Sequence, residues 1–151
     1  MTDPAPEPGY EGEPIERAPR DPENTLRAAL LVYISVNLLL GVPLTLVPSG
    51  FLDLIGINPD TAATLGGLRV FGAMLVAWGV AAMLVIARPI GRAYFVTAGV
   101  LQLTFGAVAF VYSWAIGESL GAVWFQVVAA AILSGSAGYM WWARYRVRGL
   151  L

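Results

Sequence analysis

The chain has 151 residues, of which 58% are hydrophobic and 13% are charged. Charged residues make up about a quarter of an ordinary soluble domain, so this composition favours a membrane protein. The chain contains no histidine and no cysteine. This excludes disulfides, thiolate metal sites, histidine-ligated haem and acid–base catalysis by histidine.

The formal net charge of −1 combines two segments of opposite sign. Residues 1–26 hold seven acidic residues, two arginines and six of the ten prolines. Such a segment buries too little apolar surface to offset its ordering entropy, so we expect a disordered acidic tail. The remaining chain holds seven arginines against three acids, and its basic end is residues 144–151.

Four long apolar stretches follow the tail, each close to the ~20 residues that a helix needs to cross a hydrocarbon core of ~30 Å. We therefore predict an all-α integral membrane protein, a four-transmembrane-helix bundle with a short interfacial helix. The bundle is expected over residues 27–143, with membrane helices at 27–47, 64–87, 93–115 and 120–143.

The first helix is expected to kink at Pro43, because proline removes one backbone hydrogen bond. After it, Phe51–Ile57 is apolar with one charge and too short to span a membrane. We predict that this piece lies at the outer interface as a short helix capped by Ser49, and a turn within a loop is the alternative.

The second helix has a clear start signal, with Asn58 suited to the N-cap and Pro59 to the first helical position. The tight turn Arg88–Arg92 then predicts that the second and third helices are antiparallel neighbours.

Four spans place both termini on one side, together with eight of the nine arginines; Arg69 alone lies opposite. The positive-inside rule makes the arginine-bearing side cytoplasmic. Because every basic residue is arginine, as is common in high-GC genomes, we expect a multi-pass protein of a bacterial cytoplasmic (inner) membrane.

Small residues recur along the predicted spans at spacings that favour helix packing in lipid. We interpret most of them as contacts within the bundle, and the alternative is that the set on the last helix faces another protein. These helix-packing candidates are Gly72, Gly79, Gly99, Gly106, Ala131, Gly135 and Gly138.

Polar side chains within the spans need partners, because unpaired polar groups in hydrocarbon are costly. Asn37, Gln102 and Gln126 are expected to form interhelical hydrogen bonds, or to line a site for a quinone, carotenoid or lipid headgroup. Trp78 falls near mid-membrane, where it either fills space between helices or stacks on a flat ligand.

The arginines at the membrane surface are candidate partner or lipid contacts. Arg69 is expected to pair with an outer acid, to reach a lipid phosphate, or to bind an anionic ligand. Arg144, Arg146 and Arg148 are expected to attract anionic lipid headgroups, a protein partner or the chain's own acidic tail.

Two motifs between Leu30 and Gly117 carry a resemblance to a known class. Residues 48–57 read PSGFLDLIGI, and residues 68–72 read LRVFG, with Gly79 following. This pattern resembles small bacterial four-helix membrane proteins of the DoxX-like class. The resemblance implies a four-helix fold and brings no catalytic residues.

The residue types present in the chain favour a non-catalytic accessory or structural subunit of a larger membrane complex. A respiratory or photosynthetic assembly is a natural example of such a complex. The acidic tail and one small-residue helix face would contact other subunits, and the lipids would surround the rest. The alternatives are a stand-alone lipophile- or quinone-binding protein and a small transporter. No cofactor, metal or nucleic-acid partner is expected.

Overall fold

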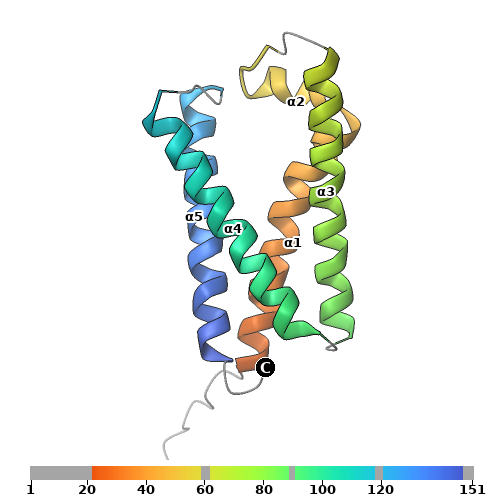
Figure 1. The fold of residues 1–151 in the computed structure, drawn as a ribbon, viewed down its shortest axis with the longest axis vertical. Coiled ribbons are helices and arrows are strands. Elements are labelled where there is room, and N and C mark those ends of the chain that lie inside the picture. Colours follow the sequence, from red (N-terminus) through yellow and green to blue (C-terminus); the bar gives the residue numbers. More distant parts are fainter. Residues whose placement is uncertain (1–21, 59–61, 89–90, 118–120, 148–151) are drawn as a thin grey trace, which may run out of the picture.

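The structure, a computed structural model, describes residues 22–58, 62–88, 91–117 and 121–147. Within these ranges it consists of five helices and confirms the predicted all-α membrane bundle (Figure 1). Four of the helices contain 24-residue stretches long and apolar enough to span a membrane. The helices are α1 (Pro22–Leu46), α2 (Pro48–Leu54), α3 (Ala62–Ala87), α4 (Arg92–Ala115) and α5 (Val123–Arg146).

The start of α1 and the end of α5 extend furthest beyond the predicted spans, and each has a local cause. α1 begins at Pro22, because proline is well suited to the first helical position, where its missing N–H is not needed. α5 continues to Arg146, because cationic side chains in the last turn interact favourably with the helix carbonyl end. The predictions for residues 1–21, for Pro59 and for Arg148 fall outside the described residues.

The short helix α2 starts directly after α1, with only Val47 between them. Val47 is the N-cap and Pro48 occupies the first turn, so the prediction that Ser49 caps this helix is wrong. Proline is preferred at this position, and the Phe51 amide donates to the Val47 carbonyl at 3.0 Å. α2 therefore has a fixed attachment to the end of α1.

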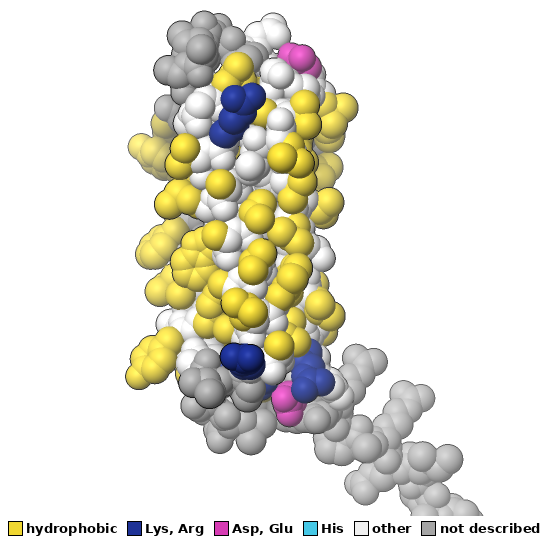
Figure 2. All heavy atoms as spheres, turned by 90° about the vertical axis from the view of Figure 1, so that its right-hand side faces the viewer, with side chains coloured by type: hydrophobic (Ala, Val, Ile, Leu, Met, Phe, Trp, Pro, Cys, Tyr) yellow, Lys and Arg dark blue, Asp and Glu magenta, His cyan; other side chains and the backbone are white. Residues whose placement is uncertain are grey.

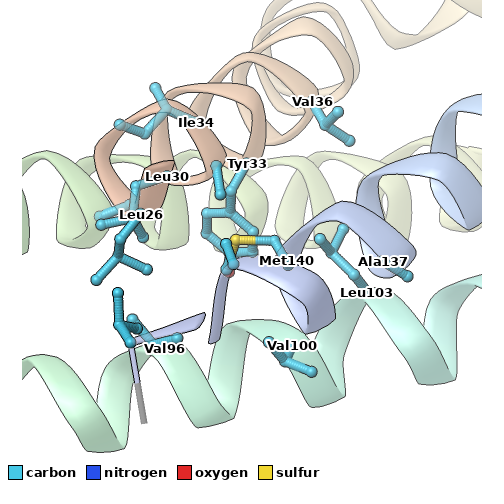
Figure 3. Close-up of a cluster of buried hydrophobic side chains, with 14 residues drawn as sticks. Leu26, Leu30, Tyr33, Ile34, Val36, Val96, Val100, Leu103, Ala137 and Met140 are labelled. Atoms are coloured by element: carbon cyan, nitrogen blue, oxygen red, sulfur yellow. The ribbon is translucent and has the colours of Figure 1, made fainter. Parts of the chain in front are cut away.

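α1 is the central helix of the bundle. It packs against α3 on one side and α5 on another, and α4 packs chiefly on α5. The core lies around Tyr33, which is fully buried between the side chains of Val96 and Val100 on α4 and Met140 on α5 (Figure 3). The most buried span is consequently α1, with 44% of its apolar window inside the bundle.

α3 and α4 lie apart along most of their length. α4 starts beside the lower end of α3 and then tilts away toward α5 (Figure 1). α3 and α4 are antiparallel but make few contacts, whereas α3 packs extensively on α1. The antiparallel turn that the sequence predicts therefore joins two helices that belong to different packing pairs.

Glycine allows α1 and α3 to approach at backbone distance. A Cβ atom on Gly41 would lie 2.9 Å from the Gly72 carbonyl oxygen, and a Cβ on Gly72 would lie 2.8 Å from the Gly41 carbonyl oxygen. Each position therefore excludes any side chain. Close backbone contact of this kind is the main source of helix association in lipid, where no hydrophobic force acts between helices.

α2 and the segment after it contact the start of α5 at the end of the bundle away from the N-terminus of α1. The Ala122 amide donates to the Ile55 carbonyl at 2.7 Å, and the ring of Phe51 meets that of Phe125 edge to face. Gly121 has a φ of 99°, and a Cβ there would lie 2.5 Å from the Ile55 oxygen. Only glycine satisfies both conditions, so this connection depends on it.

Candidate functional site

Three polar side chains form a closed group between α1 and α4, which we call the polar cluster (Tyr33, Asn37 and Gln102). The Tyr33 hydroxyl donates to Gln102 Oε1, and Gln102 Nε2 donates to Asn37 Oδ1 at 3.3 Å. Asn37 Nδ2 in turn donates to the Tyr33 backbone carbonyl at 2.9 Å. Two of the predicted membrane polar residues are therefore bonded to each other.

Trp78 belongs to an aromatic contact next to the polar cluster. Its ring lies 5.6 Å from that of Phe95, and Phe95 lies edge to face against Tyr33 at 6.1 Å. Trp78 is half-buried against the core and bridges α3 to α4 at this level. In this position it fills space between helices.

Gln126 lies apart from the polar cluster. It is buried at the start of α5, and its Nε2 donates to the Gly121 carbonyl at 2.7 Å. A shallow hollow of about 480 Å³ lies elsewhere, beside Pro43, and all of its lining residues come from α1. None of the four candidate ligand-lining residues, Asn37, Trp78, Gln102 and Gln126, borders that hollow.

The predicted helix-packing residues divide into two groups. Gly72, Gly79 and Gly99 lie at helix contacts, where a Cβ would meet atoms of α1 within 3.4 Å. Gly106, Gly135 and Gly138 face outward, and a Cβ on any of them would meet nothing within 4 Å. Ala131 is also exposed. We call the outward set on α5 (Ala131, Gly135 and Gly138) the small-residue line.

One end of the bundle concentrates the charged side chains. The N-termini of α1 and α4 and the C-termini of α3 and α5 meet there, and we call it the arginine-rich end (Figure 1). Glu23 Oε1 lies 3.5 Å from Arg27 and 3.4 Å from Arg92, so one carboxylate joins α1 to α4. The described arginines at this end are Arg27, Arg88, Arg92, Arg144 and Arg146.

Arg144 is half-buried in the seam between α5 and α4. Its Nε and Nη2 donate to Thr97 Oγ1 at 3.3 and 3.1 Å, and its guanidinium lies 5.8 Å from the centre of the Trp141 ring. Trp141 Nε1 donates to Thr104 Oγ1 at 3.0 Å. Two threonines of α4 thus anchor two side chains of α5.

Arg146 and Arg69 occupy more open positions. Arg146 is exposed and lies 5.3 Å from the centre of the Trp142 ring, which stacks on Tyr139. Arg69 is exposed on α3 near the opposite end and pairs with no acid among the described residues. On the face seen in Figure 2, charged groups are confined to the two ends and hydrophobic side chains cover the middle.

Several of these residues were not singled out from the sequence. Tyr33 precedes Asn37 by one helical turn, which places both on one face of α1. Thr97 and Thr104 are seven residues apart, a two-turn repeat that could have predicted the seam with α5. Gly41 carried no comparable signal, because its role depends on which helix lies opposite it.

Comparison with known proteins adds no relative. A scan against protein-family models, a search of curated proteins and a search of solved structures all returned no match to the chain. The DoxX-like resemblance therefore stays a prediction from the sequence. In the part of the chain that the structure describes, no three acidic, histidine or cysteine side chains gather as metal ligands.

Proposed function

We propose that this protein is a non-catalytic accessory or structural subunit of a larger membrane complex in a bacterial cytoplasmic membrane. The observation that carries the proposal is the small-residue line on α5. Gly135 and Gly138 lie on an outward face with open space in front of them. One side of the helix carries these two glycines at spacings of three and four residues within the series Val128, Ala131, Gly135, Gly138 and Trp142.

Glycine within a helix costs up to about 1 kcal/mol relative to alanine. At Gly41 and Gly72 the close contact of α1 with α3 offsets that cost, whereas the described chain offers no such contact at Gly135 and Gly138. Small residues on a lipid-facing surface are suited to a close approach by another helix. A transmembrane helix of a neighbouring subunit would supply the missing contact.

The proposed orientation follows from the charge distribution. Five described arginines lie at the arginine-rich end, against Arg69 toward the other end. By the positive-inside rule the arginine-rich end faces the cytoplasm, and both termini lie on that side. The acidic segment before α1 would then meet the cytoplasmic surface of the same partner.

The test is purification of the full chain from its native membranes in a mild detergent, followed by mass analysis of the intact particle. We expect partner subunits in stoichiometric amounts with the wild type. Gly135→Leu and Gly138→Leu should each lower the partner content several-fold, because the added side chain keeps the partner helix at a distance. Gly106→Leu, on an outward face of α4, is the matched control and should retain the partner.

Circular dichroism of each variant would show that the helices remain folded. Recovery of the wild type as a lone 16.1 kDa chain would contradict the proposal. Unchanged partner content in both α5 variants would contradict the assignment of the contact to the small-residue line.

A further inference from the structure

At the arginine-rich end, the seam between α4 and α5 holds the Arg144 guanidinium, several of whose N–H groups have no acceptor among the described residues. We infer that Arg144, Thr97 and Trp141 form a binding site for the phosphate group of an anionic phospholipid. Arg144 lies on the opposite side of α5 from Gly135, because nine residues, or two and a half turns, separate them. It is therefore independent of the proposed subunit contact.

Arg144 is held in a fixed position before any ligand arrives. Thr97 Oγ1 accepts from both Nε and Nη2 of Arg144, while the threonine hydroxyl donates to the Ala93 carbonyl at 2.8 Å. Trp141, against which the guanidinium lies, is itself bonded to Thr104. Because α4 and α5 both fix the guanidinium, little side-chain entropy remains to be lost on binding.

The fixed guanidinium retains donors for an anion. Arginine has five N–H groups, and Thr97 accepts from two of its nitrogens, so the remaining N–H groups, including both on Nη1, are directed elsewhere. The ion pairs within the described residues join Glu23 to Arg27 and Arg92, and none includes Arg144. Planar guanidinium donors match phosphate oxygens in a bidentate arrangement.

The depth of Arg144 in the membrane indicates that the phosphate belongs to a lipid. A helix of 24 residues is about 36 Å long, against a hydrocarbon core of ~30 Å, so Arg144 in the last turn reaches the headgroup layer. Toward the membrane centre the Thr104 hydroxyl is already bonded to Trp141, and the large exposed side chains there are Trp141 (43% exposed) and Leu101 (42% exposed), which are apolar over most of their surface. A phospholipid matches this arrangement, with its phosphate at Arg144 and its acyl chain along Trp141 and Leu101.

Arg146 provides a matched comparison on the same turn of α5. It also lies over a tryptophan ring, yet it is exposed and the described residues give it no hydrogen bond. Arg144→Gln and Arg146→Gln remove the same charge from the same interface. Only Arg144→Gln removes the guanidinium that Thr97 holds.

The experiment is native mass spectrometry of the full chain in detergent, titrated with dioleoylphosphatidylglycerol, with dioleoylphosphatidylcholine, or with inorganic phosphate. We expect one phosphatidylglycerol to be retained in preference to phosphatidylcholine, and no retention of inorganic phosphate. Arg144→Gln should weaken phosphatidylglycerol binding about tenfold or more, the effect of losing hydrogen bonds between charged groups rather than one surface charge. Thr97→Val should weaken it to a smaller degree, and Arg146→Gln should change it little.

Three outcomes would overturn the inference. Equal losses in Arg144→Gln and Arg146→Gln would show general attraction to negative charge. Equal retention of phosphatidylcholine would show that the apolar seam alone binds lipid, and retention of inorganic phosphate would show a free-anion site. Arg144→Lys keeps the charge and loses the planar donors, so its reduced retention would support the site even if Arg144→Gln unfolds.

Discussion

Tyr33 packs against side chains of α4 and α5, and Phe95 links it further to α3. Its ring lies edge to face against Phe95 of α4, which also meets Trp78 of α3. A Cβ on Gly99 would lie 3.3 Å from the Tyr33 ring, so this glycine of α4 makes room for it, and Met140 of α5 lies nearby. Its hydroxyl and backbone carbonyl complete the polar cluster. Tyr33 is therefore the residue at which the packing contacts and the hydrogen bonds of the bundle meet.

Removal of Gln102 tests the polar cluster. Gln102→Leu leaves the Tyr33 hydroxyl and Asn37 Oδ1 without their partner, and we expect a loss of about 1 kcal/mol in the free energy of unfolding. The measurement is unfolding in mixed micelles, followed by circular dichroism as the fraction of denaturing detergent rises. Thr45→Val, which removes a hydrogen bond within α1 alone, is the control and should change stability little.

The double variant Tyr33→Phe, Gln102→Leu sharpens this test. Both partners of one hydrogen bond are absent, so the combined loss should be smaller than the sum of the two single losses. Strict additivity would mean that the two side chains do not interact in the folded protein.

At the scale of helices, two pairs are held together by different contacts. α1 and α3 approach through glycine at Gly41 and Gly72, whereas α4 and α5 are joined by hydrogen bonds to Thr97 and Thr104. Contacts between α1 and α5 join the two pairs. α3 therefore depends on its contact with α1 for nearly all of its attachment.

Gly72→Leu should detach α3 from α1. The new side chain would meet backbone atoms of α1 at 2.8 Å, which cannot move away as a flexible side chain can. Overpacking of this kind typically costs about 1–3 kcal/mol, and the same unfolding assay would measure it. Gly106→Leu adds the same side chain where nothing lies within 4 Å, so stability should be unchanged or slightly higher. Similar losses in both variants would contradict the assigned contact.

At the scale of the whole molecule, the two ends of the bundle differ in charge. The arginine-rich end holds five described arginines and Glu23, and the opposite end holds Asp53 and Arg69. Between them the spans carry no charged side chain over most of their length, as the apolar middle of Figure 2 illustrates. The charge difference is what fixes the proposed orientation in the membrane.

Cysteine labelling tests that orientation directly, because the chain has no native cysteine. We expect Asp53→Cys in intact cells to react with a membrane-impermeant maleimide. Tyr145→Cys, at an exposed position of the arginine-rich end, should react only after the membrane is permeabilised. The reverse pattern would place the termini outside the cytoplasm.

The positions of the long helices could be predicted from the sequence, but the side of each helix that contacts its neighbours could not. Hydrophobic length alone defines a span, so the four long helices could be located without knowledge of their neighbours. A membrane helix is apolar on every side, and Gly72, Gly106 and Gly135 therefore look alike until the bundle is assembled. Asn37 and Gln102 were predicted to need partners, because an unpaired amide in hydrocarbon is costly wherever it faces.

The central position of α1 has a consequence during synthesis. α1 is made before the four helices that follow it, and Asn37 meets Gln102 only after a further 65 residues have been added. At about 5–20 residues per second this interval lasts roughly 3–13 s. Throughout that time Asn37 Nδ2 can already donate to the Tyr33 carbonyl within α1, whereas Oδ1 lacks its partner and must be hydrated or covered by another protein. Met140, which completes the cover of Tyr33, lies on α5, the last of the described helices to be synthesised.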